Sequence, residues 1–345
     1  MTVRIGILGG GNISETHALA ARETPGVEVV AYWGRDSAQT FALAGRYGGT
    51  AFGDLEAFLS HRPMEAVVVG SPSGLHAEHA GAAARRGLHV LVEKPLDIMT
   101  GRIDVLIGEC ERAGVTLGVI FQDRTAPHLV WLKHLLAQGA LGSAILVSAQ
   151  VKWHRGPEYY AGSRWRGTWA LDGGGALMNQ AIHTVDLLLW LLGDVQRVYA
   201  VTRTALHHIE VEDTAVACLE FASGAIGTLE AATSAFPGFP RRVELTGSEG
   251  TIVLEHDRVV AVRLRTPPEP PPEDEGSGNE SATSPVMSDV RGHARVLKDF
   301  VHAIRSGAAP VCDGREGRRS VAMVEALYRS ARIGVAETVP VATER

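Results

Sequence analysis

Residues 3–14, VRIGILGGGNIS, place a short apolar run rich in β-branched residues directly before a glycine-rich turn. A helical pattern that includes His17, Leu19 and Ala20 follows this turn. Strand, glycine turn and helix in this order are the context that a dinucleotide-binding fingerprint requires. The stretch therefore predicts that the chain opens with the first strand and helix of a parallel α/β sheet that binds a nucleotide cofactor.

The glycines of this stretch predict a phosphate-binding turn. Gly9 permits a tight turn, and Gly11 lets backbone N–H groups reach a pyrophosphate at the positive end of the helix. Ser14 stands where the third glycine or alanine of the fingerprint would be, and it is small enough for close packing of the helix on the strand. We expect the cofactor to contact Gly9, Gly11, Asn12 and Ile13.

The alternation of apolar runs and helical patterns continues through the first third of the chain. Strands are predicted at 27–33, 65–71, 89–94 and 115–121, and helices at 37–47, 76–86 and 103–114. Buried strands separated by helices are typical of a doubly wound parallel sheet, the Rossmann arrangement, which binds ligands at the carboxyl ends of its strands. These ends carry Gly34, Ser71, Pro72, Glu93, Lys94 and Gln122.

The chain changes character after residue 124. A helix is predicted at 127–139, and near-consecutive strands at 144–153, 195–203, 214–221, 225–233, 241–247, 250–256 and 259–265. This order predicts an α+β domain with a large, mostly antiparallel open sheet. We therefore expect a Rossmann domain over residues 1–124 and a substrate-binding and oligomerisation domain over 125–345. Within the second domain, the proline-rich and acidic stretch 266–285 is expected to form an exposed loop.

The end of the second predicted strand indicates which dinucleotide binds. An NAD-type site expects an acidic residue there, but the sequence reads Trp33-Gly34-Arg35-Asp36. A small residue followed by arginine suits the 2′-phosphate of NADP, and Asp36 is better placed to cap the next helix. The sequence therefore favours NADP, with NAD as the alternative.

The segment GGGALMNQAIHTVD, residues 173–186, leads into an apolar helix. In an α-helix Asn179, His183 and Asp186 share one stripe, because residues three and four positions apart lie on the same side. A solvated helix face is one interpretation of this stripe and a functional site is the other. Asp186 is expected to cap a nearby backbone turn or to orient the imidazole of His183.

Residues 153–169, WHRGPEYYAGSRWRGTW, gather aromatic and arginine side chains just before that segment. Aromatic faces stack on sugar rings, and arginine binds carboxylate or phosphate with two hydrogen bonds. Packing of the aromatic rings onto the sheet is the alternative for several of these residues. The candidate substrate residues of this segment are Trp153, Tyr160, Trp165 and Arg166. Arg124, just past the last strand of the first domain, and Asn179 and His183 of the segment 173–186 complete the set of candidate substrate residues.

The composition excludes several classes of function. A net charge of −6 gives no electrostatic footprint for nucleic acid, and no apolar run is long enough for a membrane span. Cys110, Cys218 and Cys312 are too few and too widely spaced for a disulfide framework, and no histidine or cysteine spacing suggests a metal site. With no signal peptide in view, these features predict a cytoplasmic protein that binds no metal, nucleic acid or membrane.

Several motifs together resemble the Gfo/Idh/MocA family of dehydrogenases, named after glucose–fructose oxidoreductase and inositol dehydrogenase. They are GILGGGNI, Ser71-Pro72 with His76, Glu93-Lys94-Pro95, GVIFQDRTAP, the segment 173–186 and the C-terminal stretches VLKDFVHAIRSG and ALYRSARIG. The resemblance implies that Lys94 and His183 face the nicotinamide as catalytic residues, and that His76 and Glu93 belong to the cofactor site. Asn179 stands where the family frequently has aspartate, and an amide cannot accept a hydroxyl proton.

This resemblance implies an NAD(P)-dependent oxidoreductase that acts on a secondary alcohol of a sugar, cyclitol or sugar derivative. His183 would accept the hydroxyl proton, while Lys94 would hold the developing alkoxide, although the sequence does not decide which is the formal base. Two alternatives remain: an NAD-dependent glycosidase and a non-catalytic nucleotide-binding regulator on the same scaffold. The family also implies a homo-oligomer, either a dimer or a tetramer.

Overall fold

The computed structural model describes residues 2–272 and 289–340, which form two compact units. Unit 1 comprises Met1–Gln122 together with Val290–Arg318, and unit 2 comprises Asp123–Asp289 together with Arg319–Arg345. The first boundary lies close to the expected one at residue 124. The second domain, however, is interrupted, because a segment that we expected to belong to it returns to the first unit.

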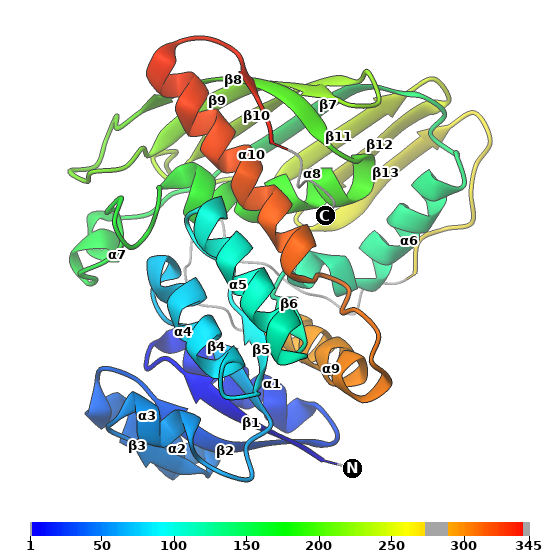
Figure 1. Ribbon diagram of the computed structural model, residues 1–345. Coiled ribbons are helices and arrows are strands. Elements are labelled where there is room, and N and C mark those ends of the chain that lie inside the picture. The colour runs from blue at the N-terminus through cyan, green and yellow to red at the C-terminus, as the bar shows by residue number, and fades with distance from the viewer. Residues whose placement is uncertain (1, 273–288, 341–345) are drawn as a thin grey trace. The chain divides into compact units, whose positions relative to one another are not determined.

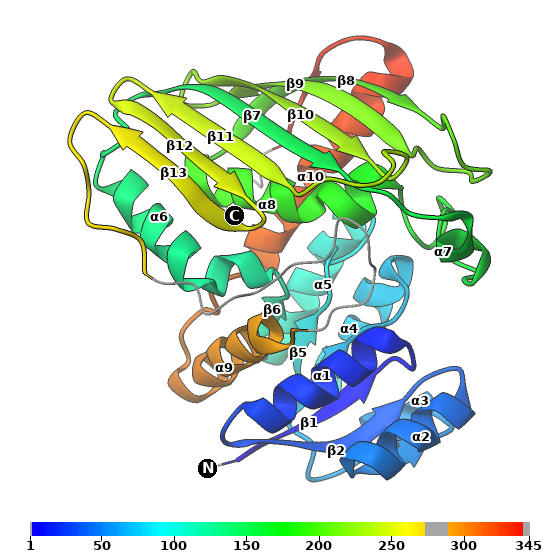
Figure 2. The same ribbon diagram turned by 180° about the vertical axis from the view of Figure 1, so that it is seen from behind.

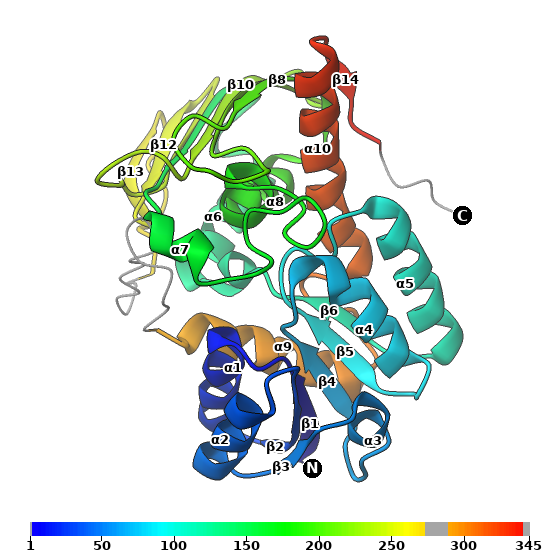
Figure 3. The same ribbon diagram turned by 90° about the vertical axis from the view of Figure 1, so that its left-hand side faces the viewer.

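Unit 1 contains a six-stranded parallel sheet in the order β3-β2-β1-β4-β5-β6 (Figure 1). Its strands are β1 (Val3–Leu8), β2 (Val27–Trp33), β3 (Thr50–Phe52), β4 (Ala66–Val69), β5 (His89–Val92) and β6 (Leu117–Val119). Its helices are α1 (Asn12–Glu23), α2 (Ser37–Tyr47), α3 (Leu55–Leu59), α4 (His76–Ala84), α5 (Thr100–Ala113) and α9 (Arg291–Ser306), with a short 3₁₀ turn, η1 (Ser73–Leu75). Helices α1 and α9 cover one face of the sheet, while α4 and α5 cover the other (Figures 1 and 3). The doubly wound parallel fold is thereby confirmed.

Helix α9 completes the apolar core of unit 1. Its buried residues Val296, Leu297 and Phe300 pack in one cluster with Val3 and Ile5 of β1. An apolar helical stripe must be covered by another element to be stable. This packing explains why Val290–Arg318 belongs to unit 1 although the strands of unit 2 precede it in the sequence.

Unit 2 contains an eight-stranded sheet in the order β13-β12-β11-β7-β10-β9-β8-β14. Its strands are β7 (Ala144–Lys152), β8 (Val195–Arg203), β9 (Thr214–Phe221), β10 (Ile226–Ala232), β11 (Arg242–Gly247), β12 (Gly250–Glu255), β13 (Arg258–Leu264) and β14 (Glu337–Thr338). All neighbouring pairs are antiparallel except β7 and β10, which run parallel. The predicted mostly antiparallel second sheet is confirmed.

The helices of unit 2 gather on one face of this sheet (Figure 2). They are α6 (Pro127–Ala137), α8 (Ile182–Leu192) with the preceding η3 (Ala176–Ala181), and the part of α10 (Gly314–Ile333) that follows Arg318. The 3₁₀ turn η2 (Gln122–Thr125) precedes α6, and the short α7 (Pro157–Ala161) lies in the connection between β7 and η3. Residues on the opposite face of the sheet alternate with buried ones and are exposed, as in β9 and β10.

The predicted loop at 266–285 lies only partly within the described residues. Residues 266–272 form no helix or strand and are mostly exposed, as expected, while the remainder of the loop lies outside the described residues. Among the helices that the structure describes, none combines the length and the hydropathy that crossing a bilayer requires.

Candidate active site

The turn after β1 has the backbone geometry of a phosphate-binding loop. Gly9 has φ +144°, and a Cβ atom there would lie 2.6 Å from the carbonyl oxygen of Gly70. A Cβ atom on Gly34, at the end of β2, would lie 2.8 Å from the backbone nitrogen of Gly10. By contrast, a Cβ atom on Gly11 would meet nothing within 4 Å, and this residue is exposed at the N-terminus of α1. The glycines therefore let the ends of β1, β2 and β4 lie close together and leave the positive end of the helix open, which suits a dinucleotide pyrophosphate.

The residues that follow β2 also match the sequence interpretation. Asp36 caps α2, because its Oδ1 accepts a hydrogen bond of 3.2 Å from the backbone N–H of Gln39. Gly34 is buried and Arg35 is exposed. The predicted helix cap is confirmed, and with it the carboxylate nearest to the end of β2 already has a structural role.

The carboxylate of Glu93, which directly follows β5, contacts other groups of the protein. Its Oε1 lies 3.2 Å from His17 Nε2 and 3.3 Å from His293 Nε2, and its Oε2 accepts from the backbone N–H of Lys94 at 3.1 Å. Burial acts to raise the pKa of Glu93, but hydrogen bonds and charge interactions with the two histidines hold it well below its usual range. Glu93 thus fixes the backbone beside Lys94. We correct its assignment as a cofactor contact to that of an anchor.

The same cluster bears on the expectation of no metal. The ligand atoms of His17, Glu93 and His293 lie within 4.8 Å of one another. Two imidazoles and one carboxylate are a ligand set that zinc uses in other proteins. The absence of a metal in this protein therefore stays a prediction.

His76 joins two of the strand-end loops in unit 1. Its Nδ1 lies 2.7 Å from the carbonyl oxygen of Pro95, and its Nε2 lies 2.7 Å from that of Ser71. Burial lowers the pKa of His76, although both carbonyl contacts act to raise it. Both ring nitrogens therefore face backbone carbonyl groups. The resemblance implied that His76 belongs to the cofactor site, and the structure gives it a supporting role there, because it joins two loops of that site. Ser71, Pro72, Lys94 and Gln122 remain partly exposed at the strand ends.

The polar segment in unit 2 is not one regular α-helix. Residues Ala176–Ala181 form a π-helical segment, η3, and the α-helix α8 starts only at Ile182. A π-helical turn contains more residues than an α-helical turn and occurs often at functional sites. The even stripe predicted for Asn179, His183 and Asp186 is therefore wrong. Asn179 and His183 are partly exposed, while Asp186 is completely buried.

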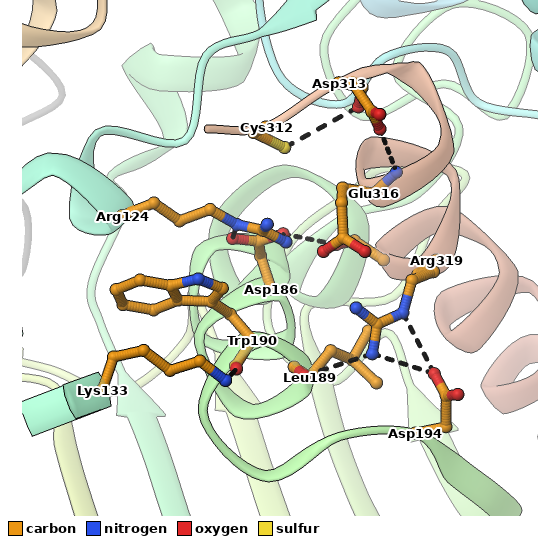
Figure 4. Close-up of polar contacts among 11 residues, drawn as sticks. Arg124, Lys133, Asp186, Leu189, Trp190, Asp194, Cys312, Asp313, Glu316 and Arg319 are labelled. Carbon is orange, nitrogen blue, oxygen red and sulfur yellow. Dashed lines mark hydrogen bonds and ion pairs between the residues drawn. The ribbon is translucent and has the colours of Figure 1, made fainter. Parts of the chain in front are cut away.

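Asp186 forms a buried ion pair with Arg124 (Figure 4). Nε and one terminal nitrogen of Arg124 each donate to the carboxylate at 2.8 Å, and Ser320 Oγ donates to it at 3.0 Å. Arg124 is 2% exposed and Asp186 is 0% exposed. The predicted substrate contact of Arg124 is therefore wrong, since its guanidinium is buried against a carboxylate. Asp186 neither caps a turn nor orients His183.

Two cationic side chains, Arg319 and Lys133, hold the C-terminal end of α8 (Figure 4). Arg319 donates to Asp194 from Nε at 3.0 Å and to the Leu189 carbonyl oxygen at 3.2 Å. Lys133 donates to the Trp190 carbonyl oxygen and lies 5.9 Å from the centroid of the Trp190 ring. Cations near the end of a helix satisfy its last carbonyl groups. These contacts fix α8 in unit 2, and with it the segment that carries His183.

Glu212, which the sequence analysis missed, holds the glycine turn before η3. Its carboxylate accepts from the backbone N–H groups of Gly175 at 3.0 Å and Leu177 at 2.8 Å, and from the Tyr328 hydroxyl at 2.9 Å. Burial raises the pKa of Glu212 to about 7, against the opposing effect of these hydrogen bonds. No short-range motif marks this residue, because its partners lie far from it in the sequence.

The aromatic segment 153–169 divides into packed and accessible side chains. Trp153 is buried, with the Arg155 guanidinium 5.3 Å from its ring centroid. Tyr160, Trp165 and Arg166 are partly exposed. The Arg166 guanidinium lies 5.5 Å from the Trp165 ring centroid, and Tyr160 Oη lies 2.9 Å from Thr233 Oγ1. Packing is therefore the better account of Trp153, while the other three remain candidates for a substrate wall.

Comparison with known proteins gives a consistent assignment. Residues 3–121 match the model of an oxidoreductase family with an NAD-binding Rossmann fold, and residues 129–253 match the Gfo/Idh/MocA C-terminal domain. The chain is 30% identical to D-xylose 1-dehydrogenase (NADP(+)) 2 of Haloferax volcanii, covering 96% of this chain and 98% of that protein. It is 26% identical to inositol 2-dehydrogenase of Rhizobium meliloti, with 96% and 97% covered.

A solved structure extends this likeness to the fold. The WlbA dehydrogenase from Bordetella pertussis, in complex with NADH and UDP-GlcNAcA, superposes with a TM-score of 0.89 at 32% identity. The match covers 99% of this chain and 98% of that one. The chain therefore belongs to the Gfo/Idh/MocA oxidoreductase family and is an enzyme, a dehydrogenase built on an NAD-binding Rossmann fold.

Proposed function

We propose that the protein oxidises or reduces a secondary alcohol position of a sugar, cyclitol or sugar derivative with a nicotinamide dinucleotide. The observation that carries this proposal is the pairing, in one chain, of an open glycine turn at α1 with both Lys94 and His183 of the family motifs. Relatives named as xylose and inositol dehydrogenases support the same substrate class. A non-catalytic regulator would need neither side chain, and the glycosidase alternative has no relative among those described above.

The residues suit the cofactor and divide the chemistry between them. Gly9, Gly11, Asn12 and Ile13 would hold the pyrophosphate, since the turn is open and lies at a helix N-terminus. When bound, the nicotinamide ring supplies the hydride acceptor or donor. His183 takes the hydroxyl proton during oxidation, and Lys94 stabilises negative charge on the substrate oxygen.

The test combines a substrate screen with one variant. Sugars, cyclitols and sugar nucleotides are offered with each cofactor, and turnover is followed by absorbance of the reduced nicotinamide. For the substrate found, His183→Ala should lower kcat by about 10²- to 10⁴-fold, because a general base is removed. Cofactor affinity should stay unchanged. A near-wild-type kcat in this variant would contradict the role given to His183.

The finer cofactor preference is for NADP, with NAD as the weaker ligand. Arg35 is exposed after β2, and the nearby Asp36 carboxylate caps α2 instead of meeting a ribose. Arginine at this place favours a 2′-phosphate. Arg35→Ala should weaken NADP binding by about 1.5–3 kcal/mol and leave NAD binding nearly unchanged. Titration of both proteins with both cofactors checks this, and equal NADP affinities would refute the preference.

The oligomeric state and the cellular location are two further proposals. The open face of the eight-stranded sheet exposes apolar side chains, which supports a homo-oligomer, either a dimer or a tetramer; they include Leu146, Tyr199, Val201, Val216 and Ile226. Exposed apolar patches of this kind often mark subunit contacts. The three cysteines are free thiols, which supports a reducing, cytoplasmic location. Mass measurement in solution tests the first expectation.

A further inference from the structure

Four polar side chains of unit 2 form a continuous chain of hydrogen bonds. Asn179 Nδ2 donates to Asp172 Oδ1 at 2.5 Å, and Gln180 Nε2 donates to Asn179 Oδ1 at 2.9 Å. Arg155 Nη2 donates to Gln180 Oε1 at 3.1 Å. Asp172, Gln180 and Arg155 are buried, while Asn179 is partly exposed. The chain therefore runs from a carboxylate, through two amides, to a guanidinium.

The two ends of this chain fix the orientation of both amides. An ionised carboxylate only accepts hydrogen bonds, and a guanidinium only donates them. Asn179 must therefore turn its NH₂ group toward Asp172, and Gln180 must turn its oxygen toward Arg155. Flipping either amide would place two acceptors or two donors against each other, with the loss of at least one buried hydrogen bond. The opposite charges at the ends make the orientation of Asn179 a property of the fold.

The oxygen of Asn179 is already used within the protein. It accepts from Gln180 Nε2 and also from the Tyr159 hydroxyl, at 3.4 Å. Because a carbonyl oxygen has two acceptor positions, any further contact of this amide is made by donation from Nδ2. Tyr159 is itself held in place, since Gln180 Nε2 lies 3.0 Å from its hydroxyl and Arg166 lies 4.2 Å from its ring centroid.

We propose that Asp172 is the positioning residue of the site, and that it makes Asn179 an obligate hydrogen-bond donor to an acceptor oxygen of the substrate. Asp172 supplies the carboxylate beside position 179 that this position itself lacks. It is held by the backbone N–H of Gly167, which donates to its Oδ2 at 2.8 Å. The ligand identity rests on the proposed function, whereas the pairing of Asp172 with Asn179 rests on the contacts alone.

Asn179→Asp tests the pairing, because it places a second carboxylate against Asp172. Two carboxylates at this distance share one proton, and the second proton is lost only at a raised pKa. A group whose pKa is raised in the folded state stabilises less as pH increases. The unfolding temperature of Asn179→Asp should therefore fall relative to wild type as pH rises from about 4, the ordinary carboxyl pKa of the unfolded chain, toward pH 9.

The double variant Asp172→Asn/Asn179→Asp is the matched control. It keeps one carboxylate and one amide in contact, so its unfolding temperature should follow that of wild type across the same pH range. Five charged or titratable side chains that contact the hydrogen-bonded residues or interact with Asp172 are unchanged in every variant: Arg155, Arg166, Tyr159, Tyr160 and Tyr328. The pKa values of the three tyrosines are raised, mainly by burial, so these groups stay neutral in this range.

Kinetics with an identified substrate test the donor role separately. Both variants with aspartate at 179 should lose about 10- to 100-fold in kcat/KM, because a donor is replaced by an acceptor. Asp172→Asn should lose less kcat/KM, and mainly through KM, since Asn179 keeps its NH₂ group but not its fixed orientation.

Wild-type pH dependence of stability in Asn179→Asp, or no rescue in the double variant, would overturn the pairing. Undiminished kcat/KM in the double variant would overturn the donor role. The stability arm needs no substrate, so its failure is distinct from failure of the proposed function.

Discussion

Two buried glutamates anchor the backbone beside the proposed functional residues, and their surroundings differ. Glu93 in unit 1 faces His17 and His293, and these interactions hold its pKa well below the usual range. Glu212 in unit 2 is held by backbone N–H groups and the Tyr328 hydroxyl, and burial raises its pKa to about 7. Both carboxylates lose hydration, but only the first has partners that can carry positive charge.

The comparison shows that burial alone does not decide the charge of a carboxylate. Hydrogen bonds from fixed dipoles lower the pKa of Glu212 but do not overcome its desolvation. The two histidines add hydrogen bonds and a charge interaction that lower the pKa of Glu93 well below its usual range, even though burial lowers the pKa of His17. The two anchors should therefore respond to pH in opposite directions.

Glu93→Gln should have the largest effect on stability. Removing one partner of a buried ionic cluster typically costs about 3–5 kcal/mol. The contribution of Glu93 is present above the carboxyl pKa of the unfolded chain and is lost as pH falls through the depressed pKa of the folded state. The free energy of unfolding in urea at pH 7 measures the cost. Glu56→Gln, which removes an exposed carboxylate paired with Arg86, serves as the control. A cost below about 1 kcal/mol would place Glu93 among ordinary surface carboxylates.

Glu212→Gln should change the pH dependence of stability. A folded pKa of about 7 against an ordinary 4.5 means that wild type loses stability as pH rises through this interval. The loss is of the order of 3 kcal/mol. Glutamine does not titrate at this position. The free energy of unfolding of the variant, measured in urea, should therefore increase relative to that of wild type from pH 5 to pH 8. Parallel curves for the two proteins would show that Glu212 stays charged, as Glu93 does.

Tyr328→Phe should have the smallest effect and sharpens the same contrast. It removes a hydroxyl that donates to Glu212 at 2.9 Å, a loss of about 1–1.5 kcal/mol. The pKa of Glu212 should rise further, and with it the midpoint of the pH-dependent loss of stability. Tyr47→Phe is the control, because the Tyr47 hydroxyl donates to Glu15 near the surface. If both variants behaved alike, the Tyr328 hydroxyl would not be coupled to the charge of Glu212.

The elements of the fold follow closely from local patterns in the sequence. The cap at Asp36 and the strands at 27–33, 195–203 and 214–221 lie where they were predicted. Strand β3 and helix α3 were missed, because elements of three and five residues are too short to show a periodicity. The predicted stripe on one helix failed because no propensity indicates the π-helical turn at 176–181.

The polar partners could not be predicted in the same way. Arg124 and Asp186 are 62 residues apart in the sequence, and Glu212 lies 37 residues from Gly175. Periodicity describes neighbours within a turn or along a strand, whereas these contacts depend on how the elements pack. Asp172 is only seven residues from Asn179. It lies in an irregular turn, however, and sequence patterns do not predict the orientation of side chains in such a turn.

The return of α9 to unit 1 sets the order in which the protein can be completed during synthesis. The chain emerges from the ribosome N-terminus first, and domains usually fold as they appear. Here Val3 and Ile5 pack against Val296 and Phe300 in one core cluster. Val296 and Phe300 are synthesised only after all strands from β7 to β13. The nucleotide-binding half, although encoded first, therefore cannot complete its core until β7 to β13 of the other unit have been made. A nascent chain that stops before residue 290 leaves part of this core uncovered, so that folding quality control would meet an incomplete Rossmann domain and a second sheet that lacks only β14.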